Sequence, residues 1–351
     1  MSGKRVVRVR KKRRLRKRRV LLAGIIVLLL SIVSYSSFQF VAGQNLGSEN
    51  GGIGNSDENK EKTEQFENRQ EYDFEEPEDK KINILFVGSD QREEEVSRTD
   101  TIMIGQYDTE SGEAKLVSIM RDTFVEIPEY GYNKINASYA IGDVALLTET
   151  IESNFGVPID HYAVVNFNGF KDIINTIAPS GIEMDVEKRM QYQSGSGDVN
   201  IDLYPGEQML DGEELLNYAR FRSDSESDFG RVRRQQQVMS ALKEEMLSFS
   251  SVPSLPKTAG LLTSYIATDM TNTEIMNYGR KFLLDPPENM ETKRIPVEGS
   301  YTNERIEGKG AVLSHNEEQN RQAIQEFLNG TGATANTETE STNEESISSP
   351  S

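Results

Sequence analysis

Two aspartates stand at the ends of neighbouring predicted strands. Asp90 follows a buried-strand pattern over residues 81–88, and Asp100 leads into a second strand over 101–107. If the two strands are antiparallel neighbours, both carboxylates lie at one end of the sheet. Two carboxylates and a substrate phosphate are a suitable ligand set for Mg²⁺. The alternative is that both aspartates form turns and that Arg98 simply pairs with Asp100.

Basic residues stand at two further element ends. Arg121 and Asp122 follow a strand predicted over residues 115–120. The carboxylate either orients the guanidinium toward a phosphate or forms an internal ion pair with it. Lys134 precedes a long predicted helix and is either a phosphate contact or a solvated lysine.

The most specific signal is a group of basic residues around the start of a second long predicted helix. Arg220 and Arg222 precede this helix, and Arg231 and Gln235 lie one turn apart at its N-terminal end. Helix N-termini carry a positive dipole and free N–H groups, so they bind anions. Asp228 is either the helix N-cap or a carboxylate that offsets the arginines. A solvated charged loop is the alternative, but clustered arginines in a strongly acidic chain favour an anion site.

The charge is very unevenly distributed along the chain. Twelve of the 39 Lys and Arg residues lie in residues 1–19, so residues 20–351 carry a net charge of −30. Residues 20–42 are apolar and provide the roughly 20 residues that a bilayer span requires. The basic tail predicts a cytoplasmic N-terminus, a single-pass type II protein of the cell membrane and an extracellular domain. A signal peptide cleaved near residues 41–43 is the alternative. The tail then contacts membrane lipid, and no nucleic acid partner is expected.

Composition divides the remaining chain into three parts. Residues 43–80 are acidic, poor in apolar side chains and predicted to be a disordered linker. Residues 330–351 are rich in Ser, Thr and Glu and are predicted to be a disordered tail. Residues 81–329 then form one folded domain. With no cysteine and two histidines, the chain has no disulfide, thiol nucleophile, zinc–thiolate site or multi-histidine metal centre.

Strand and helix patterns alternate irregularly within this domain. Further strands are predicted over residues 161–167, 181–186 and 293–297. Helices are predicted over residues 136–155, 169–178, 211–219, 231–249, 271–283 and 316–328. This order predicts an α/β fold of the mixed α+β kind, with a central mixed β-sheet flanked by helices on both faces.

A series of segments between residues 82 and 247 resembles, in order, the LytR–CpsA–Psr family. They include Ile82–Asp90, Arg98–Met103, Ser118–Thr123, Lys134–Ala137, Tyr218–Arg222 and Asp228–Gln236. Met120 stands where the family usually has proline, a departure that removes no charged group. The resemblance implies a phosphotransferase that moves an anionic glycopolymer, such as wall teichoic acid or capsule, from an undecaprenyl-pyrophosphate carrier to the 6-hydroxyl of muramic acid in peptidoglycan.

The resemblance also implies roles for single residues. Asp90 and Asp100 would hold Mg²⁺ or Mn²⁺. The expected pyrophosphate contacts are Arg98, Arg121, Lys134, Arg220, Arg222, Arg231 and Gln235. The catalytic candidates are Arg98, Arg121, Asp122 and Asp228, and either aspartate orients arginines or accepts the acceptor's proton.

The resemblance further implies a tunnel for the polyprenyl chain. The apolar faces of the helices predicted over 136–155 and 231–249 would wall it, although both faces are also consistent with ordinary core. The alternative functions are a polyprenyl-pyrophosphate phosphatase and a membrane-anchored regulator or attenuator of cell-envelope processes.

Overall fold

The computed structural model describes residues 35, 37–47, 53, 54, 56–70, 81–90, 98–194, 199–223, 227–248 and 255–330. The predicted basic tail, residues 20–34 of the predicted span, and residues 331–351 lie outside this range. Within it, no helix combines the length and the apolar character that a membrane crossing requires.

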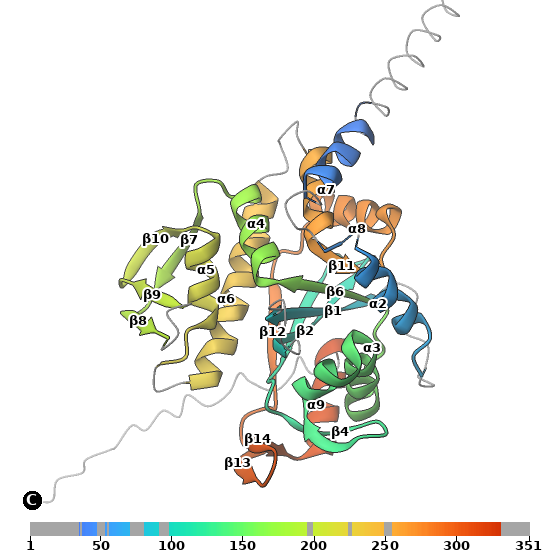
Figure 1. Cartoon of the computed structure of the whole chain (residues 1–351), viewed down its shortest axis with the longest axis vertical. Helices are drawn as coiled ribbons and strands as arrows, with labels where there is room; N and C mark the ends of the chain where they lie inside the picture. Colours follow the sequence, from blue (N-terminus) through green and yellow to red (C-terminus); the bar gives the residue numbers. More distant parts are fainter. Residues whose placement is uncertain are drawn as a thin grey trace, which may run out of the picture.

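A six-stranded mixed sheet forms the centre of the molecule (Figure 1). Its order is β11-β6-β1-β2-β3-β12. The strands are β1 (Lys81–Asp90), β2 (Arg98–Asp108), β3 (Ala114–Ile119), β6 (His161–Asn166), β11 (Ile266–Thr268) and β12 (Met290–Ile295). β1, β2 and β3 pair antiparallel in sequence order, whereas β6 runs parallel to β1 and β12 parallel to β3. The predicted mixed sheet is confirmed.

Helices cover both faces of this sheet (Figure 1). One face carries α3 (Ile135–Phe155) and α9 (Glu317–Asn329), and it buries the main apolar core, which includes Leu85, Ile104, Leu147 and Ile324. The other face is covered by α4 (Phe167–Ile177), α5 (Gly212–Arg220) and α6 (Ser227–Ser248). The alternation of side chains along a strand explains how one sheet serves two different layers.

A second apolar core lies between α4, α5, α6 and two small sheets. β7 (Ile182–Val186) pairs with β10 (Gly206–Leu210), and β8 (Met190–Gln193) pairs with β9 (Asn200–Leu203). The remaining elements are α7 (Leu255–Tyr265), α8 (Asn272–Leu284) and two hairpins, β4–β5 (Phe124–Ile127 and Gly131–Lys134) and β13–β14 (Tyr301–Ile306 and Gly310–His315). α7, the small strands β8–β11 and both hairpins were not predicted from the sequence.

Part of the predicted disordered linker is a helix that packs on the domain. α2 (Asp57–Glu67) begins after Ser56, whose Oγ accepts a hydrogen bond from the backbone N–H of Asn59 at 3.1 Å. Phe66 is 3% exposed, and its ring centroid lies 5.0 Å from that of Tyr162. Residues 43–47 are also helical. The prediction of disorder over the whole of 43–80 is therefore wrong, because one buried aromatic side chain anchors a segment of polar composition.

Candidate active site

A β-bulge brings Asp100 into the site. Gly88 lies opposite Thr101 and Ser89 opposite Thr99, so the pairing of β1 and β2 skips Asp100. A bulge leaves one residue unpaired and turns its side chain out of the regular alternation. Asp100 lines a cavity on the α4–α6 face of the sheet.

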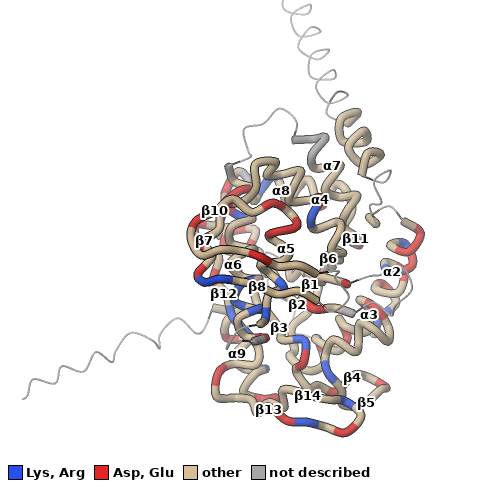
Figure 2. Tube along the Cα trace, turned by 60° about the vertical axis from the view of Figure 1, so that its left-hand side comes forward, with Lys and Arg blue, Asp and Glu red and all other residues tan. Residues whose placement is uncertain are grey.

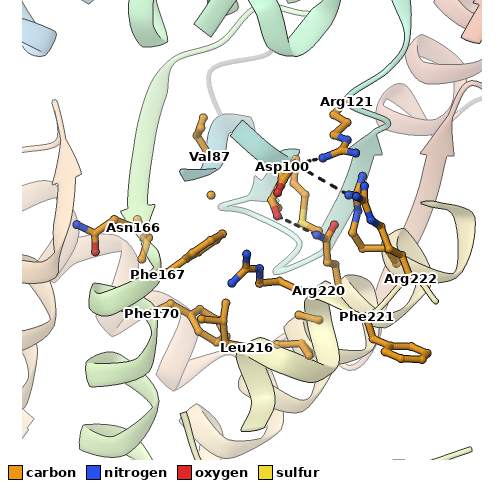
Figure 3. A pocket seen from close by; sticks show the side chains of 18 of the residues that line it. Val87, Asp100, Arg121, Asn166, Phe167, Phe170, Leu216, Arg220, Phe221 and Arg222 are labelled. Carbon is orange, nitrogen blue, oxygen red and sulfur yellow. Dashed lines mark hydrogen bonds and ion pairs between the residues drawn. The ribbon is translucent and has the colours of Figure 1, made fainter. Parts of the chain in front are cut away.

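Arginines from two other elements surround Asp100. Arg121, which follows β3, donates to Asp100 Oδ1, and Figure 3 shows the two side chains pointing toward each other. Arg231 of α6 lies 4.0 Å from the same oxygen, and its other terminal nitrogen is 3.0 Å from Asp228 Oδ1. Its side chain is 4% exposed. Arg121 also lies 3.9 Å from Asp228. Segments far apart in the sequence thus meet at one ionic cluster.

The charges in this cluster stabilise one another against burial. Burial opposes the ionised form of Asp100, but Arg121 and Arg231 outweigh it and hold the pKa of Asp100 below its usual value. Burial likewise opposes the charged form of Arg121, whose pKa is nevertheless raised by its carboxylate neighbours. For Arg231, burial and the positive charge of Arg121 lower the pKa in spite of Asp228 and Asp100. Additional negative charge beside Arg231 would therefore stabilise its charged form.

Asp122 lies behind this cluster and links two basic residues. Its Oδ2 lies 3.4 Å from Arg121 Nε, and its Oδ1 lies 2.8 Å from Lys134 Nζ. Lys134 occupies the N-cap position of α3 and makes no side-chain capping bond. Asp122 and Lys134 do not line the cavity. The structure thus places both within the ionic network rather than in the cavity wall.

The other predicted residues surround the cluster on the cavity side. Arg220 lies over the ring of Phe167 at 4.1 Å. Arg222 is about half exposed and lies 4.0 Å from Asp228. Gln235 donates from Nε2 to Thr101 Oγ1 at 2.9 Å. Arg220, Arg222 and Gln235 all line the cavity, and their contact with a pyrophosphate stays a prediction.

The cavity has a volume of about 400 Å³ and changes from basic to apolar along its wall. Its polar part, in which arginines predominate, is formed by Asp100, Arg121, Arg220, Arg222, Arg231 and Gln235. Its apolar part includes Phe86, Met103, Val165, Phe167, Phe170, Ile201, Leu216, Phe221, Val238 and Met239. Figure 3 shows Arg220 between the phenylalanines of α4 and Asp100. Such a site matches a ligand with an anionic head and an apolar tail.

Of the two helices predicted to wall a tunnel, only one lines this cavity. α6 contributes Val238 and Met239, but no residue of α3 lines the cavity. The apolar face of α3 packs instead into the main core on the opposite face of the sheet. α4 and α5 supply the second wall, and sequence reasoning missed them. The i, i+3 spacing of Phe167 and Phe170 is the signal that marks this face of α4.

The predicted metal ligands occupy one end of one strand pair. Asp90 ends β1 opposite Arg98, which begins β2, and Asp100 follows two residues later. The side chain of Arg98 lies outside the described part of the chain. Among the described residues, no three His, Cys, Asp or Glu side chains gather as a metal-binding group. A metal held here would therefore depend on these two carboxylates and on oxygen ligands from a substrate.

Known proteins are similar to this chain in sequence and in fold. Regulatory protein MsrR of Staphylococcus aureus (strain COL) is 42% identical over 250 residues, which are 71% of this chain and 75% of that protein. A Bacillus cereus protein named polyisoprenyl-teichoic acid–peptidoglycan teichoic acid transferase TagU is 32% identical over 221 residues, 62% of this chain and 69% of that one. The crystal structure of B. subtilis TagV superimposes with a TM-score of 0.61 and 30% identity, covering 72% of this chain and 99% of that chain.

The family model described as the LytR_cpsA_psr family matches residues 45–326. This match includes α2, both hairpins and every residue of the arginine cluster, so it extends well beyond the segments 82–247 that carry the resemblance in sequence. The chain belongs to the LytR–CpsA–Psr family.

Proposed function

We propose that this protein is a phosphotransferase that moves an anionic glycopolymer from a polyprenyl-pyrophosphate carrier to peptidoglycan. The observation that carries the proposal is the continuity of one cavity from the Asp100–Arg121–Arg231 cluster to the apolar side chains of α4, α5 and α6. A polyprenyl pyrophosphate has the same division into a charged head and an apolar chain. The name of the B. cereus relative, a teichoic acid transferase acting on a polyisoprenyl-linked polymer, supports this substrate class.

The basic residues of the site outnumber its carboxylates. The cations are Arg121, Lys134, Arg220, Arg222 and Arg231, and the carboxylates beside them are Asp100, Asp122 and Asp228. A pyrophosphate supplies the missing negative charge, and planar guanidinium groups match its oxygens in geometry. The burial of Arg231 places this interaction in a region of low dielectric, where it is strong.

The reaction requires one displacement at phosphorus. The acceptor hydroxyl oxygen bonds to the phosphorus that carries the glycan, and the bond from that phosphorus to the bridging oxygen breaks. Polyprenyl phosphate leaves with the bonding electron pair, and the hydroxyl proton passes to a carboxylate, for which Asp122 and Asp228 are the candidates. Phosphoryl transfer depends mainly on positioning and on electrostatic stabilisation of the spreading charge. Arg121, Arg220 and Arg231 are arranged to provide both.

Mg²⁺ or Mn²⁺ fits the donor set at the end of β1 and β2. Asp90 and Asp100 offer oxygen ligands, and the lowered pKa of Asp100, set against burial by Arg121 and Arg231, keeps it ionised. When bound, the cation would neutralise charge on the phosphate oxygens. The residues of this chain hold and orient the pyrophosphate around it.

We also propose that residues 20–42 anchor the protein as a single-pass type II membrane protein with its domain outside the cell. The twelve basic residues before the apolar run carry this part of the proposal. A reporter fused to the C-terminus is expected to be extracellular, and a cytoplasmic reporter would overturn the topology.

The transfer itself is tested with the detergent-solubilised full chain. We expect linked product when it is incubated with a polyprenyl-pyrophosphate-linked glycan, Mg²⁺ and soluble peptidoglycan oligomers. Phosphate release without acceptor would identify a phosphatase instead. Absence of product with every wall polymer tried would favour a regulatory role, the role named for the S. aureus relative.

A further inference from the structure

The β13–β14 hairpin is fastened to the loop that carries Arg121 and Asp122. The backbone N–H of Leu313 donates to the carbonyl oxygen of Asp122 at 2.8 Å, and Thr123 forms an isolated bridge with Leu313. Met120 and Leu313 pack in one small apolar cluster. The hairpin therefore borders the ionic cluster. It lies outside residues 82–247, the range in which the sequence resembles the family.

An aromatic pair lies where the β13–β14 hairpin meets the ionic cluster. Tyr301, the first residue of β13, stacks on Phe229 of α6 with ring centroids 5.2 Å apart and an interplanar angle of 30°. Phe229 directly follows Asp228, and Arg294 lies 4.5 Å from the Phe229 ring. Both aromatic side chains are half-buried. Neither of them lines the cavity, and neither does Lys134 on the adjacent hairpin.

The geometry of displacement at phosphorus determines the side from which the acceptor hydroxyl approaches. In phosphoryl transfer the attacking and leaving oxygens lie roughly in line, on opposite sides of the phosphorus. The proposed leaving group occupies the cavity formed by α4, α5 and α6. The acceptor hydroxyl must then approach from the opposite side of the arginine cluster. Leu313, Tyr301 and Lys134 stand on elements that contact the cluster without entering the cavity.

The shape of the whole molecule agrees with this direction. Figures 1 and 2 show the helix at residues 37–47 at one end and the hairpins β4–β5 and β13–β14 at the other. The helix at 37–47 includes the last residues of the apolar run 20–42 that is predicted to cross the membrane. The two hairpins accordingly face away from the predicted membrane, toward the cell wall.

The chemistry of this surface suits a saccharide. A pyranose ring presents C–H groups on its faces and hydroxyls at its edge, so it stacks on an aromatic ring while its edge makes hydrogen bonds. Tyr301 offers a partly exposed ring, and the exposed Thr302, Asn303 and Arg305 continue β13 with polar groups. Lys134 Nζ already pairs with Asp122, and a carboxylate of the glycan would share this cation. Peptidoglycan combines such sugars with such carboxylates.

We propose that Tyr301, supported by Phe229, is the acceptor subsite, where a sugar ring of the peptidoglycan strand stacks beside the arginine cluster. This inference rests on the proposed transferase function. It assigns a role in acceptor recognition to the β13–β14 hairpin.

The test compares Tyr301→Leu with Tyr301→Phe in the full chain. Leucine keeps an apolar contact with Phe229 but loses the aromatic face, whereas phenylalanine keeps both. We expect Tyr301→Leu to raise the KM for soluble peptidoglycan oligomers about tenfold, with Tyr301→Phe close to the wild-type protein. The Kd for the polyprenyl-pyrophosphate donor is expected to stay unchanged in both. Tyr204→Leu is the matched control, because Tyr204 is a 63% exposed tyrosine outside this border.

The outcomes separate the two proposals. Wild-type protein that forms no linked product contradicts the proposed function itself. Wild-type protein that forms product, with an unchanged acceptor KM in Tyr301→Leu, contradicts the subsite alone. An equal loss of donor affinity would also contradict it, since the effect would then not be specific to the acceptor. Thermal unfolding of each variant identifies any loss of fold, and in that case Tyr301→Met replaces the leucine variant and is subject to the same criterion.

Discussion

The guanidinium of Arg220 lies 4.1 Å from the centroid of the Phe167 ring, at the point where the cavity changes from basic to apolar. Phe167 is the first residue of α4, and the side chain of Asn166 caps that helix by accepting from the Gly169 N–H at 2.7 Å. The cap fixes the start of the helix, and the ring in turn supports the arginine. One aromatic residue therefore contributes both to the apolar wall and to the placement of a cation.

Replacing Phe167 by leucine should weaken the placement of Arg220 while keeping an apolar wall. A cation–π contact contributes about 0.5–2 kcal/mol, so we expect kcat/KM for transfer to fall roughly two- to thirtyfold. Phe167→Tyr should retain most activity because its ring is preserved. Phe124→Leu is the control, since the Phe124 ring contacts Tyr132 in a tilted arrangement outside the cavity. Equal activity in Phe167→Leu and the wild-type protein would show that the stack does not contribute.

Asp100→Asn should separate donor binding from transfer. The change leaves Arg121 and Arg231 without the carboxylate between them, so we expect transfer to fall by about a hundredfold or more through loss of alignment. Donor affinity should not fall, because the site becomes more positive. Binding and single-turnover measurements distinguish the two effects, and Asp185→Asn, an exposed change on β7, is the control. Parallel losses of affinity and rate would contradict this division.

The lowered pKa of Asp100, maintained against burial by Arg121 and Arg231, also sets a pH dependence. A carboxyl whose folded pKa is below its unfolded value stabilises the fold above the unfolded pKa, and this contribution is lost as the pH falls through the folded pKa. The usual pKa of an Asp carboxyl is 3.8. Titration of Asp100 should therefore cause no loss of stability between pH 7 and pH 5. Urea unfolding of the wild-type protein and Asp100→Asn should give a constant difference over that range.

The pH dependence of stability that arises from Glu152 should have the opposite sign. Burial raises its pKa from 4.5 to about 6, in spite of the Ile159 N–H that donates to it at 3.0 Å and of Arg69. The folded state then binds the proton more tightly than the unfolded state, so this carboxyl costs stability as the pH rises from about 4.5 to above 6. Glu152→Gln should be more stable than the wild-type protein at pH 7, by an amount on the order of 2 kcal/mol. The difference should shrink as the pH falls from about 6 to 4.5, and a constant difference would contradict the raised pKa.

Phe66→Ala tests whether α2 is part of the folded domain. Loss of a buried phenylalanine costs about 3–5 kcal/mol, and Phe66 also contacts Tyr162 and the guanidinium of Arg69. We expect the free energy of unfolding in urea to fall by about 3 kcal/mol or more. Gln65→Ala, an exposed change on the same helix, should have little effect. Equal stability of the two variants would mean that the packing of α2 does not stabilise the folded domain.

The sequence indicates the parts of the site that depend on strand ends. Arg121 follows the strand pattern of residues 115–120, and the start of α6 is marked by its arginines, so both could be placed from the sequence. The position of Asp100 in a bulge could not, because a bulge depends on how β1 and β2 pair. The same strand pair carries Asp90, whose role as a metal ligand stays a prediction.

Helix patterns were less informative about which face each helix covers. An apolar face was predicted for both α3 and α6, yet only α6 lines the cavity, because the direction of the chain after β3 takes α3 to the opposite face of the sheet. Periodicity identifies an apolar face but not its partner. The short strands β8 and β9 pair with each other, as do β13 and β14, and none of the four has a strong pattern of its own.

The most direct test of the central claim is a crystal structure of the protein with a polyprenyl pyrophosphate. The account predicts pyrophosphate oxygens within hydrogen-bonding distance of Arg121, Arg220 and Arg231. It also predicts that the prenyl chain runs along Phe170 and Leu216, between α4, α5 and α6. A pyrophosphate bound away from these arginines, or a prenyl chain against α3, would contradict the account.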